Sequence, residues 1–331
     1  MADRLRVGIV GCGGIARAHV NAYRTIPEVD IVSVHDVAAS AAEALARETD
    51  ARIANSPQEM AAVDHLDAVS ICTPPALHFQ HCKPFLQARI PVLCEKPLEA
   101  NVRAAGRLAE LARRSRTVFM TAFCHRFHPA IIELKKLIES GSLGKPLLFR
   151  NMFGGYLPLK GNHRADPALS GGGVLIDNGS HSVDLFRFLV GEPAAVWAVA
   201  GNVMQKLPVE DIAMIVLERR GKVLGEITSS YSLKGCPNQL EWYGTQGVAV
   251  VSYWNPDEPD LKYKLEGQAE WTVVDCSAHP DRFAGEVGHF IDCVRSGQRK
   301  AAVTVEDGYR ASVIIQAAYE SVGKGKKIVL R

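Results

Sequence analysis

Two side chains that can accept or donate a proton lie four positions apart near the middle of the sequence. Asp177 and His181 follow the triple glycine 171–173, in a segment whose pattern predicts a helix over 174–190. Residues at this spacing share one helix face, so the carboxylate and the imidazole can point together toward a ligand. A histidine titrates near neutral pH and can both take and give a proton. The structural alternative is that Asp177 stabilises the helix start and His181 only packs.

A lysine stands at the end of a predicted strand. Lys96 follows the apolar strand 91–94 and lies between Glu95 and Pro97. Pro97 restricts how the backbone can present the lysine. Beside a bound substrate, its ammonium group could hold and polarise an oxygen atom. A solvated surface lysine is the alternative, and the sequence leaves both open.

The chain begins with a glycine-rich turn, Gly11-x-Gly13-x-x-Ala16, between an apolar strand at 5–10 and a predicted helix at 14–26. This order is typical of a dinucleotide-binding turn. Gly11 permits the tight bend, Gly13 lets the backbone approach a pyrophosphate, and Ala16 allows the helix to pack closely on the strand. The helix N-terminus supplies N–H groups and a positive dipole end for the phosphates.

Asp36 bears on which dinucleotide would bind. It follows the second apolar strand, 31–35, where this motif expects a carboxylate for the adenosine ribose hydroxyls. That carboxylate would repel a 2′-phosphate, and residues 37–39 include no arginine to hold one. The sequence therefore favours NAD over NADP. The alternative is that Asp36 merely begins a turn.

Two patterns of elements divide the chain. Up to about residue 122, apolar strands alternate with helical segments, which predicts an α/β Rossmann domain with a doubly wound parallel sheet. From about residue 124, extended segments with alternating polar and apolar positions predict an α+β domain with a large, open, mostly antiparallel sheet. We therefore predict two domains, 1–123 and 124–331. The extended segments of the second domain are 146–153, 195–204, 211–218, 222–231, 238–243, 248–252, 261–265, 270–274 and 327–330.

Composition limits the function classes. The 331 residues are 47% hydrophobic, and the net charge of +2 gives no reason to expect nucleic acid or an anionic membrane as a partner. The eight cysteines form no Cys-x-x-Cys pair and no zinc-finger spacing, so we expect reduced thiols and no metal site. No apolar run approaches about 18 residues, and the first strand begins at Leu5, too early for a signal peptide. A cytoplasmic protein is expected.

Five motifs follow one another along the chain. They are Gly11-x-Gly13-x-x-Ala16, Thr73-Pro74-Pro75-x-x-His78, Glu95-Lys96-Pro97, Arg126-Phe127-x-Pro129 and Gly171-Gly172-Gly173-x-x-x-Asp177-x-x-x-His181-x-x-Asp184. Together and in this order they resemble the glucose-fructose oxidoreductase / inositol dehydrogenase / MocA family. The resemblance covers nearly the whole chain, through the region 321–325.

The resemblance implies NAD(P)-dependent oxidation of a hydroxyl on a sugar or a cyclic polyol such as an inositol. It implies a catalytic group of Lys96, Asp177 and His181. The residues expected at the cofactor are Gly11, Gly13, Gly14, Ile15, Ala16, Asp36, Thr73, Pro74, His78, Glu95 and Lys96. Substrate contacts are expected from Arg126 and Asn178, with His125, His163 and Arg164 as weaker candidates.

Three other functions stay open at this point. They are an NADPH-dependent keto-sugar reductase, a glycosidase that oxidises and re-reduces its sugar with tightly held NAD, and a non-catalytic nucleotide sensor. Asp36 argues against the first, and the set of Lys96, Asp177 and His181 argues against the last. The exposed face expected of one large sheet favours a homodimer or homotetramer.

Overall fold

The computed structural model describes residues 4–255 and 257–330, so residues 1–3 and 331, at the ends of the predicted domains, lie outside the described residues. Contacts divide the chain into two compact units. The first unit runs to Cys124 and includes Asp281–Arg310, and the second holds His125–Pro280 and the chain from Ala311 onward. The sequence-based division put 281–310 in the second domain. The structure groups this segment with the first unit because its helix α9 packs against α1.

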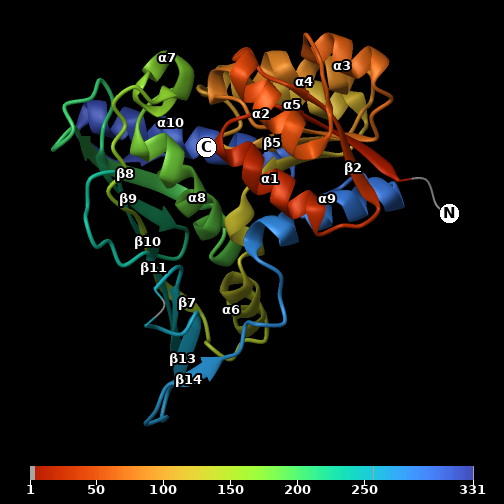
Figure 1. Ribbon diagram of the computed structural model, residues 1–331. Helices are drawn as coiled ribbons and strands as arrows, with labels where there is room; N and C mark the ends of the chain where they lie inside the picture. The colour runs from red at the N-terminus through yellow and green to blue at the C-terminus, as the bar shows by residue number, and fades with distance from the viewer. Residues whose placement is uncertain (1–3, 256, 331) are drawn as a thin grey trace. The chain divides into compact units, whose positions relative to one another are not determined.

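The first unit is built on a six-stranded parallel sheet in the order β3-β2-β1-β4-β5-β6, with helices α1 to α5 and α9 around it (Figure 1). This is the predicted doubly wound Rossmann arrangement. The strands are β1 (Leu5–Val10), β2 (Val29–His35), β3 (Arg52–Ile53), β4 (Ala68–Ile71), β5 (Val92–Glu95) and β6 (Phe119–Ala122). The helices are α1 (Gly14–Arg24), α2 (Ala39–Thr49), α3 (Pro57–Val63), α4 (His78–Gln87), α5 (Val102–Ser115) and α9 (Arg282–Ser296).

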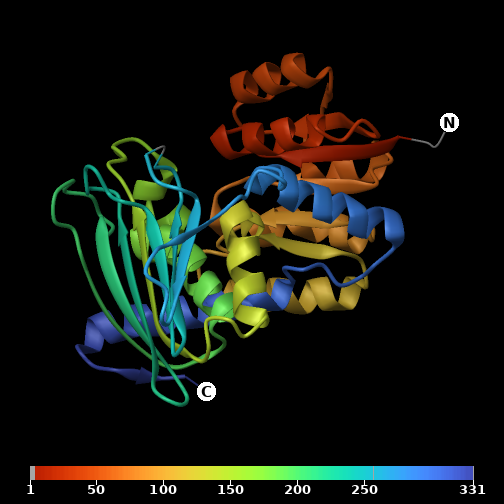
Figure 2. The same ribbon diagram turned by 90° about the horizontal axis from the view of Figure 1, so that it is seen from below.

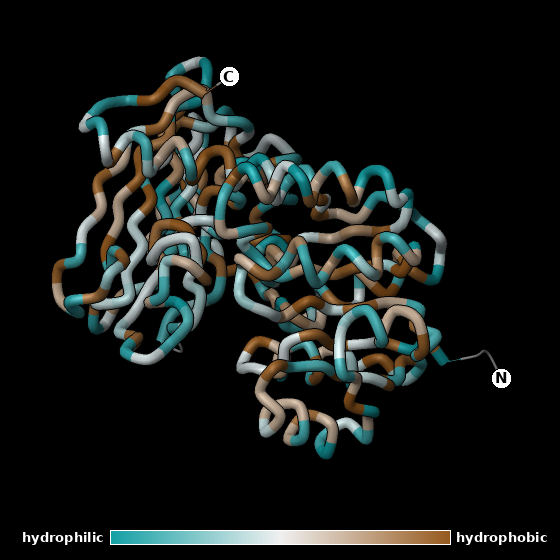
Figure 3. Tube along the Cα trace, turned by 90° about the horizontal axis from the view of Figure 1, so that it is seen from above, coloured by the Kyte–Doolittle hydropathy of each residue, from teal (hydrophilic) through white to brown (hydrophobic). Residues whose placement is uncertain are grey.

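The central and outer strands β4, β5 and β6 are mostly apolar because helices cover the faces of their sheet. All residues of β4, β5 and β6 are buried, and the apolar side chains of the helices pack against them. Such continuous apolar runs are what a parallel sheet requires. In Figure 3, many of the turns are teal, the colour of hydrophilic residues. Two helix starts are fixed by side chains, since Ser56 caps α3 and Asn101 caps α5.

The glycine turn after β1 passes very close to the end of β4. Gly11 has a φ of +91°, and a Cβ atom there would lie 2.7 Å from the backbone carbon and oxygen of Cys72. Only glycine fits, because both the backbone conformation and the space exclude a side chain. Gly13 and Gly14 differ, since a Cβ atom on either would meet nothing within 4 Å. Their missing side chains leave open space at the start of α1.

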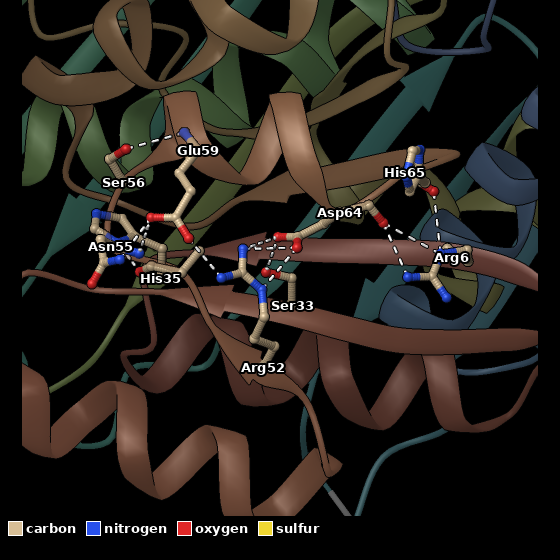
Figure 4. Close-up of polar contacts among 10 residues, drawn as sticks. Arg6, Ser33, His35, Arg52, Asn55, Ser56, Glu59, Asp64 and His65 are labelled. Atoms are coloured by element: carbon tan, nitrogen blue, oxygen red, sulfur yellow. Dashed lines mark hydrogen bonds and ion pairs between the residues drawn. The ribbon is translucent and has the colours of Figure 1, made fainter.

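A group of ion pairs fixes the edge of this sheet (Figure 4). Asp64, just after α3, accepts hydrogen bonds from Nε and Nη2 of Arg52 at 2.8 Å each and from the buried Ser33 hydroxyl at 2.6 Å. Nη1 of Arg52 donates to Glu59 at 2.6 Å. Because Ser33 lies in β2 and Arg52 in β3, the contacts tie the edge strand β3 and its neighbour β2 to α3. They hold in place the strand that ends just before Asp36.

The second unit contains a nine-stranded sheet in the order β14-β13-β12-β11-β7-β10-β9-β8-β15. All neighbours pair antiparallel except β7 and β10, which are parallel, so the predicted large and mostly antiparallel sheet is confirmed. Figure 2 shows its green and cyan strands as one continuous sheet. The strands are β7 (Pro146–Gly154), β8 (Pro193–Gly201), β9 (Ile212–Arg219), β10 (Val223–Ser230), β11 (Gln239–Gly244), β12 (Gly247–Ser252), β13 (Leu261–Leu265), β14 (Thr272–Val274) and β15 (Ile328–Val329).

One face of this sheet is covered by a long helix. The helices of the second unit are α6 (Pro129–Glu139), α7 (Pro167–Ser170) and α8 (Val174–Leu189), and α10 (Val305–Lys324) begins in the first unit and continues into the second. α8 packs on β7, β9 and β10, where the ring of Phe186 lies over Gly225. A Cβ atom on Gly225 would lie 2.7 Å from that ring, so glycine is required for the close approach. The opposite face carries exposed apolar side chains, including Trp197 and Met214.

We expect Gly11→Ala and Gly13→Ala to have different effects. Gly11→Ala should lower the free energy of unfolding by about 2 kcal/mol or more, because it combines a positive φ with a backbone clash. Gly13→Ala should change it by less than about 0.5 kcal/mol, since its Cβ atom enters open space. Urea unfolding measures both. Equal losses in the two variants would contradict this account of the turn.

Candidate active site

The start of α8 is held by the backbone and side chain of one acidic residue. Glu210 accepts the backbone N–H groups of Gly173 and Leu175 on Oε1, at 3.0 Å each, and that of Val174 on its own carbonyl oxygen at 3.0 Å. The hydroxyl of Tyr319, from α10, donates to the same Oε1 at 2.7 Å. The first N–H groups of a helix have no partner within the helix, and here one carboxylate satisfies two of them.

The triple glycine makes this cap possible. A Cβ atom on Gly173 would lie 2.9 Å from the backbone carbon of Glu210, and one on Gly172 would lie 2.8 Å from Cζ of Tyr319. Gly171 has a φ of +82° and ends the short helix α7. The glycines therefore serve close packing and a chain reversal at the start of α8, which fixes the position of the residues that follow.

Asp177, in the first turn of α8, is held by two donors. Its Oδ2 accepts Nε of Arg164 at 2.9 Å and the hydroxyl of Tyr231 at 2.5 Å. Burial, and then the charge of Asp177, raise the pKa of Tyr231 well above its usual range, so the phenol stays a hydrogen-bond donor. Arg164, predicted as a substrate contact, donates to Asp177 and orients its carboxylate. The carboxylate cannot rotate freely.

His181 lies one turn further along α8, on the same helix face as Asp177, and is buried. Its ring stacks on that of His125, with centroids 4.2 Å apart and an interplanar angle of 13°. Phe153 meets the His181 ring edge-on at 5.9 Å. Tyr253 packs beside His125 at 5.4 Å. These ring contacts restrict the plane of the imidazole.

Tyr231 and Ser232, which follow β10 directly, are held by a second acidic residue. The carbonyl oxygen of Asp211 accepts the backbone N–H of Tyr231 at 2.8 Å, and its Oδ2 accepts the Ser232 hydroxyl at 2.7 Å. The same buried carboxylate accepts three backbone N–H groups, those of Val203, Met204 and Gln205. Burial alone would raise the pKa of Asp211, but these donors hold it below its usual range. The carboxylate is therefore ionised in the folded protein at neutral pH.

The remaining predicted substrate residues have different surroundings. Arg126 is buried and makes a bidentate ion pair with Asp184, with Nε to Oδ2 at 2.7 Å and Nη2 to Oδ1 at 2.6 Å. Two of its nitrogens are thus engaged with the protein. Asn178 is half-buried, and its Nδ2 donates to the Phe153 carbonyl oxygen at 3.4 Å. His163 is exposed.

In the first unit, the predicted cofactor residues follow neighbouring strands of the parallel sheet. Asp36 comes directly after β2. Its Oδ2 accepts the backbone N–H of Cys12 at 2.7 Å, and its Oδ1 accepts that of Ala38 at 2.8 Å. Each carboxylate oxygen has a second lone pair, which can accept a ribose hydroxyl. With the open space at Gly13 and Gly14, these residues fit a dinucleotide whose pyrophosphate lies at the start of α1.

Lys96 follows β5, the next strand but one from β1, and is half-buried. The Glu95 carboxylate accepts the backbone N–H of Lys96 on Oε2 at 3.1 Å, and its Oε1 lies 3.0 Å from Nε2 of His19. The peptide bond between Lys96 and Pro97 is cis. Glu95 is itself buried, so its contacts are with the protein interior.

The turn after β4 is stabilised by a histidine. His78 is fully buried, with Nε2 at 2.8 Å from the Thr73 carbonyl oxygen and Nδ1 at 3.3 Å from that of Leu98. Burial alone would lower the pKa of His78, but Cys94, the Thr73 carbonyl and Glu99 raise it to about 9. A protonated imidazole donates to both carbonyls. His78 thus holds the backbone carbonyl groups of Thr73 and Leu98 in place.

Sequence reasoning missed Glu210, Asp211, Tyr231 and Tyr319. Each acts through a partner far away in the sequence. The one available signal was the pair of adjacent acids, Glu210 and Asp211, just before an apolar strand. It does not reveal which N–H groups the acids accept.

We expect Asp211→Asn to lower the free energy of unfolding by at least about 2 kcal/mol at neutral pH, because hydrogen bonds to a charged acceptor are lost. The native pKa of Asp211 is depressed, so its contribution is present above the unfolded pKa of about 3.9 and is lost as the pH falls through the native value. Urea unfolding at several pH values measures this. Asp260→Asn, at an exposed position, is the control. A deficit that stayed constant into acid would contradict the assignment.

Comparison with known proteins places these features in a family. Residues 5–123 match the oxidoreductase family with an NAD-binding Rossmann fold, and residues 131–250 match the GFO/IDH/MocA C-terminal domain. Myo-inositol 2-dehydrogenase of Thermotoga maritima is 25% identical, over 98% of each chain. Levoglucosan dehydrogenase of Pseudarthrobacter phenanthrenivorans is 26% identical, over 97% of each chain.

A solved structure of levoglucosan dehydrogenase, in complex with NADH and levoglucosan, superimposes with a TM-score of 0.90 at 25% identity and 99% coverage of both chains. Among the described residues, no helix is long and apolar enough to cross a membrane. The two domain matches together cover more than half of the sequence and contain Gly11, Lys96, Asp177 and His181. The chain belongs to the GFO/IDH/MocA family of NAD-binding oxidoreductases.

Proposed function

We propose that this protein oxidises a secondary hydroxyl of a sugar, sugar derivative or cyclic polyol to a ketone, with NAD⁺ as the hydride acceptor. The observation that carries the proposal is the Asp177 and His181 pair on one face of α8. The carboxylate is fixed by Arg164 and Tyr231, and the imidazole is fixed by stacking. Such a pre-arranged acid and base suits proton removal from a hydroxyl group.

Family relatives support a cyclic, polyhydroxylated substrate. One acts on myo-inositol and another on levoglucosan, and both align with this chain over nearly its full length. Inositol and levoglucosan share a ring that carries several secondary hydroxyl groups. We therefore extend this substrate class to the present protein.

In the proposed mechanism, His181 removes the proton of the substrate hydroxyl. Its ring plane is set by His125, so the accepting nitrogen keeps a constant direction. Asp177 accepts a hydrogen bond from a substrate hydroxyl or stabilises the imidazolium that forms on His181. Lys96 stabilises the developing alkoxide of the substrate. Bound NAD⁺ supplies the hydride acceptor. Lys96, Asp177 and His181 thus form the proposed catalytic group.

The cofactor residues act by binding and orientation. The backbone at Gly13, Gly14 and Ile15 is proposed to approach the pyrophosphate, and Asp36 to accept the ribose hydroxyls. A carboxylate at position 36 also opposes a 2′-phosphate, which supports oxidation with NAD⁺ over reduction with NADPH. Asn178 and the exposed His163 remain proposed substrate contacts. Arg126 is also a proposed substrate contact, and it would bind the substrate while its guanidinium stays paired with Asp184.

The test is NADH formation with a panel of inositols, hexoses and anhydrosugars, in wild type and His181→Asn. We expect one substrate class to reduce NAD⁺ and His181→Asn to lower kcat about 100-fold or more with little change in NADH affinity. His279→Asn, which removes a histidine paired with Glu133, is the control. Normal turnover in His181→Asn would reject this base. Glycoside cleavage without NADH accumulation would instead favour the transient-redox alternative.

We further propose that the protein is a homodimer or homotetramer formed through the outer face of the large sheet. Trp197 and Met214 are each 45% exposed there, and Val199 pairs with Met214 across β8 and β9. On the same sheet, Arg150 bridges the carboxylates of Glu226 and Glu241. A face with apolar side chains and both signs of charge can pair with a second copy of itself.

Met214→Lys should convert the oligomer into monomers, because it places a charge in the proposed apolar contact. Light scattering after size-exclusion chromatography measures the mass. Val37→Lys, at an exposed position of the first unit, should leave the mass unchanged. A monomeric wild type, or an unchanged mass in Met214→Lys, would contradict the proposal.

We also propose a cytoplasmic location, which the eight free cysteine thiols support.

A further inference from the structure

A buried acid in the first unit has no role in the proposed reaction. Glu286 lies in α9, which packs against α1, and its side chain is 0% exposed. Neither of its carboxyl oxygens has a hydrogen-bond partner among the described residues. Buried polar groups are almost always hydrogen-bonded, and a buried carboxylate ion without a partner is strongly disfavoured. Glu286 therefore needs a physical explanation.

The groups around Glu286 come from several elements. Glu95, the last residue of β5, is the acid whose charge acts on it, and Arg282 lies one turn earlier in α9. Burial, and then the charge of Glu95, raise the pKa of Glu286 well above its usual range, while Arg282 acts in the opposite direction. The other titratable groups whose pKa responds to the charge of Glu286 are Tyr23 of α1, Cys72 and Cys124.

The contacts of Glu95 suit a carboxylate, whose two oxygens are both acceptors. Oε2 accepts the backbone N–H of Lys96 at 3.1 Å, and Oε1 lies 3.0 Å from Nε2 of His19. Nδ1 of His19 lies 3.1 Å from the buried Ser70 hydroxyl, so the contacts continue into the core. Two buried carboxyl groups that act on one another do not both ionise readily. A proton on Glu95 would weaken these contacts, whereas a proton on Glu286 would leave them intact.

We propose that Glu286 remains a neutral carboxylic acid in the folded protein and is a positioning residue for Glu95. Its neutrality leaves the single negative charge of the pair on Glu95, where it anchors the backbone of Lys96 at the end of β5. An ionised Glu286 would repel the Glu95 carboxylate and loosen this anchor. Glu286, Glu95 and Lys96 all lie in the first unit, and their charges in the folded protein do not depend on which substrate is oxidised.

The first test is the pH dependence of unfolding in urea, followed by circular dichroism. Wild type and Glu286→Gln are compared with Asp292→Asn, which removes an exposed acid from the same helix. A carboxyl group with a raised native pKa is protonated when folded and releases its proton on unfolding. Its stabilising effect is complete below the unfolded pKa of about 4.3 and is lost as the pH rises.

Above the unfolded pKa, and until the pH reaches the raised native pKa, the unfolding constant of wild type should therefore rise about tenfold per pH unit relative to that of Glu286→Gln. Asp292→Asn should keep the wild-type slope. Equal slopes in wild type and Glu286→Gln would overturn the proposal, because Glu286 would then be ionised in the folded protein. If Glu286→Gln does not fold, the infrared spectrum of the wild type decides. A protonated-carboxyl band must be present at neutral pH and must persist in Glu99→Gln, and its absence overturns the proposal.

The positioning role has its own measurement, the rate of hydrogen exchange in the peptide that contains Lys96. Glu286→Gln should leave this rate unchanged, because a neutral amide of the same shape preserves the charge on Glu95. Glu95→Gln should accelerate exchange, because it removes the charged acceptor of the Lys96 N–H. Acceleration in Glu286→Gln equal to that in Glu95→Gln would overturn the assignment.

Discussion

The second unit depends on two neighbouring acids that hold different elements. Glu210 caps the start of α8, and Asp211 holds the end of β10. A hydrogen bond from Tyr231, which follows β10, to Asp177 of α8 forms a second connection between these two elements, at 2.5 Å. The contacts therefore form a closed loop, in which a shift of α8 or of β10 would break an interaction with a charged group. Rigid placement of this kind is what a proton-transfer site requires.

The first unit achieves the same fixation mainly through its backbone. Asp36 and Glu95 each follow or end a parallel strand, and each accepts a backbone N–H group from a residue in its own or a neighbouring turn. Gly11 allows the first turn to lie against the end of β4 without a side chain between them. Because parallel strands end at the same edge of the sheet, local anchors of this kind place several polar groups beside one another. The positions of Asp36 and Glu95 at this edge of the sheet therefore depend on close packing of the backbone.

Much of this could be predicted from the sequence, and the failures have a common cause. The glycine turn, the apolar strands and the four-residue spacing of Asp177 and His181 are local signals, and the structure confirms the elements that they predict. The return of α9 to the first unit and the parallel pairing of β7 with β10 depend on distant contacts. The same holds for Glu210 and for the pairing of Arg126 with Asp184, since no local pattern names their partners.

The central claim is that hydride passes from a ring carbon of the substrate to the cofactor while His181 takes the hydroxyl proton. The most direct measurement uses a substrate found by the panel, deuterated at the carbon that bears the oxidised hydroxyl. The NADH that forms is then analysed by mass spectrometry. The account predicts that each NADH molecule carries the deuterium, because the transfer is direct and does not exchange with water. Unlabelled NADH would contradict the claim.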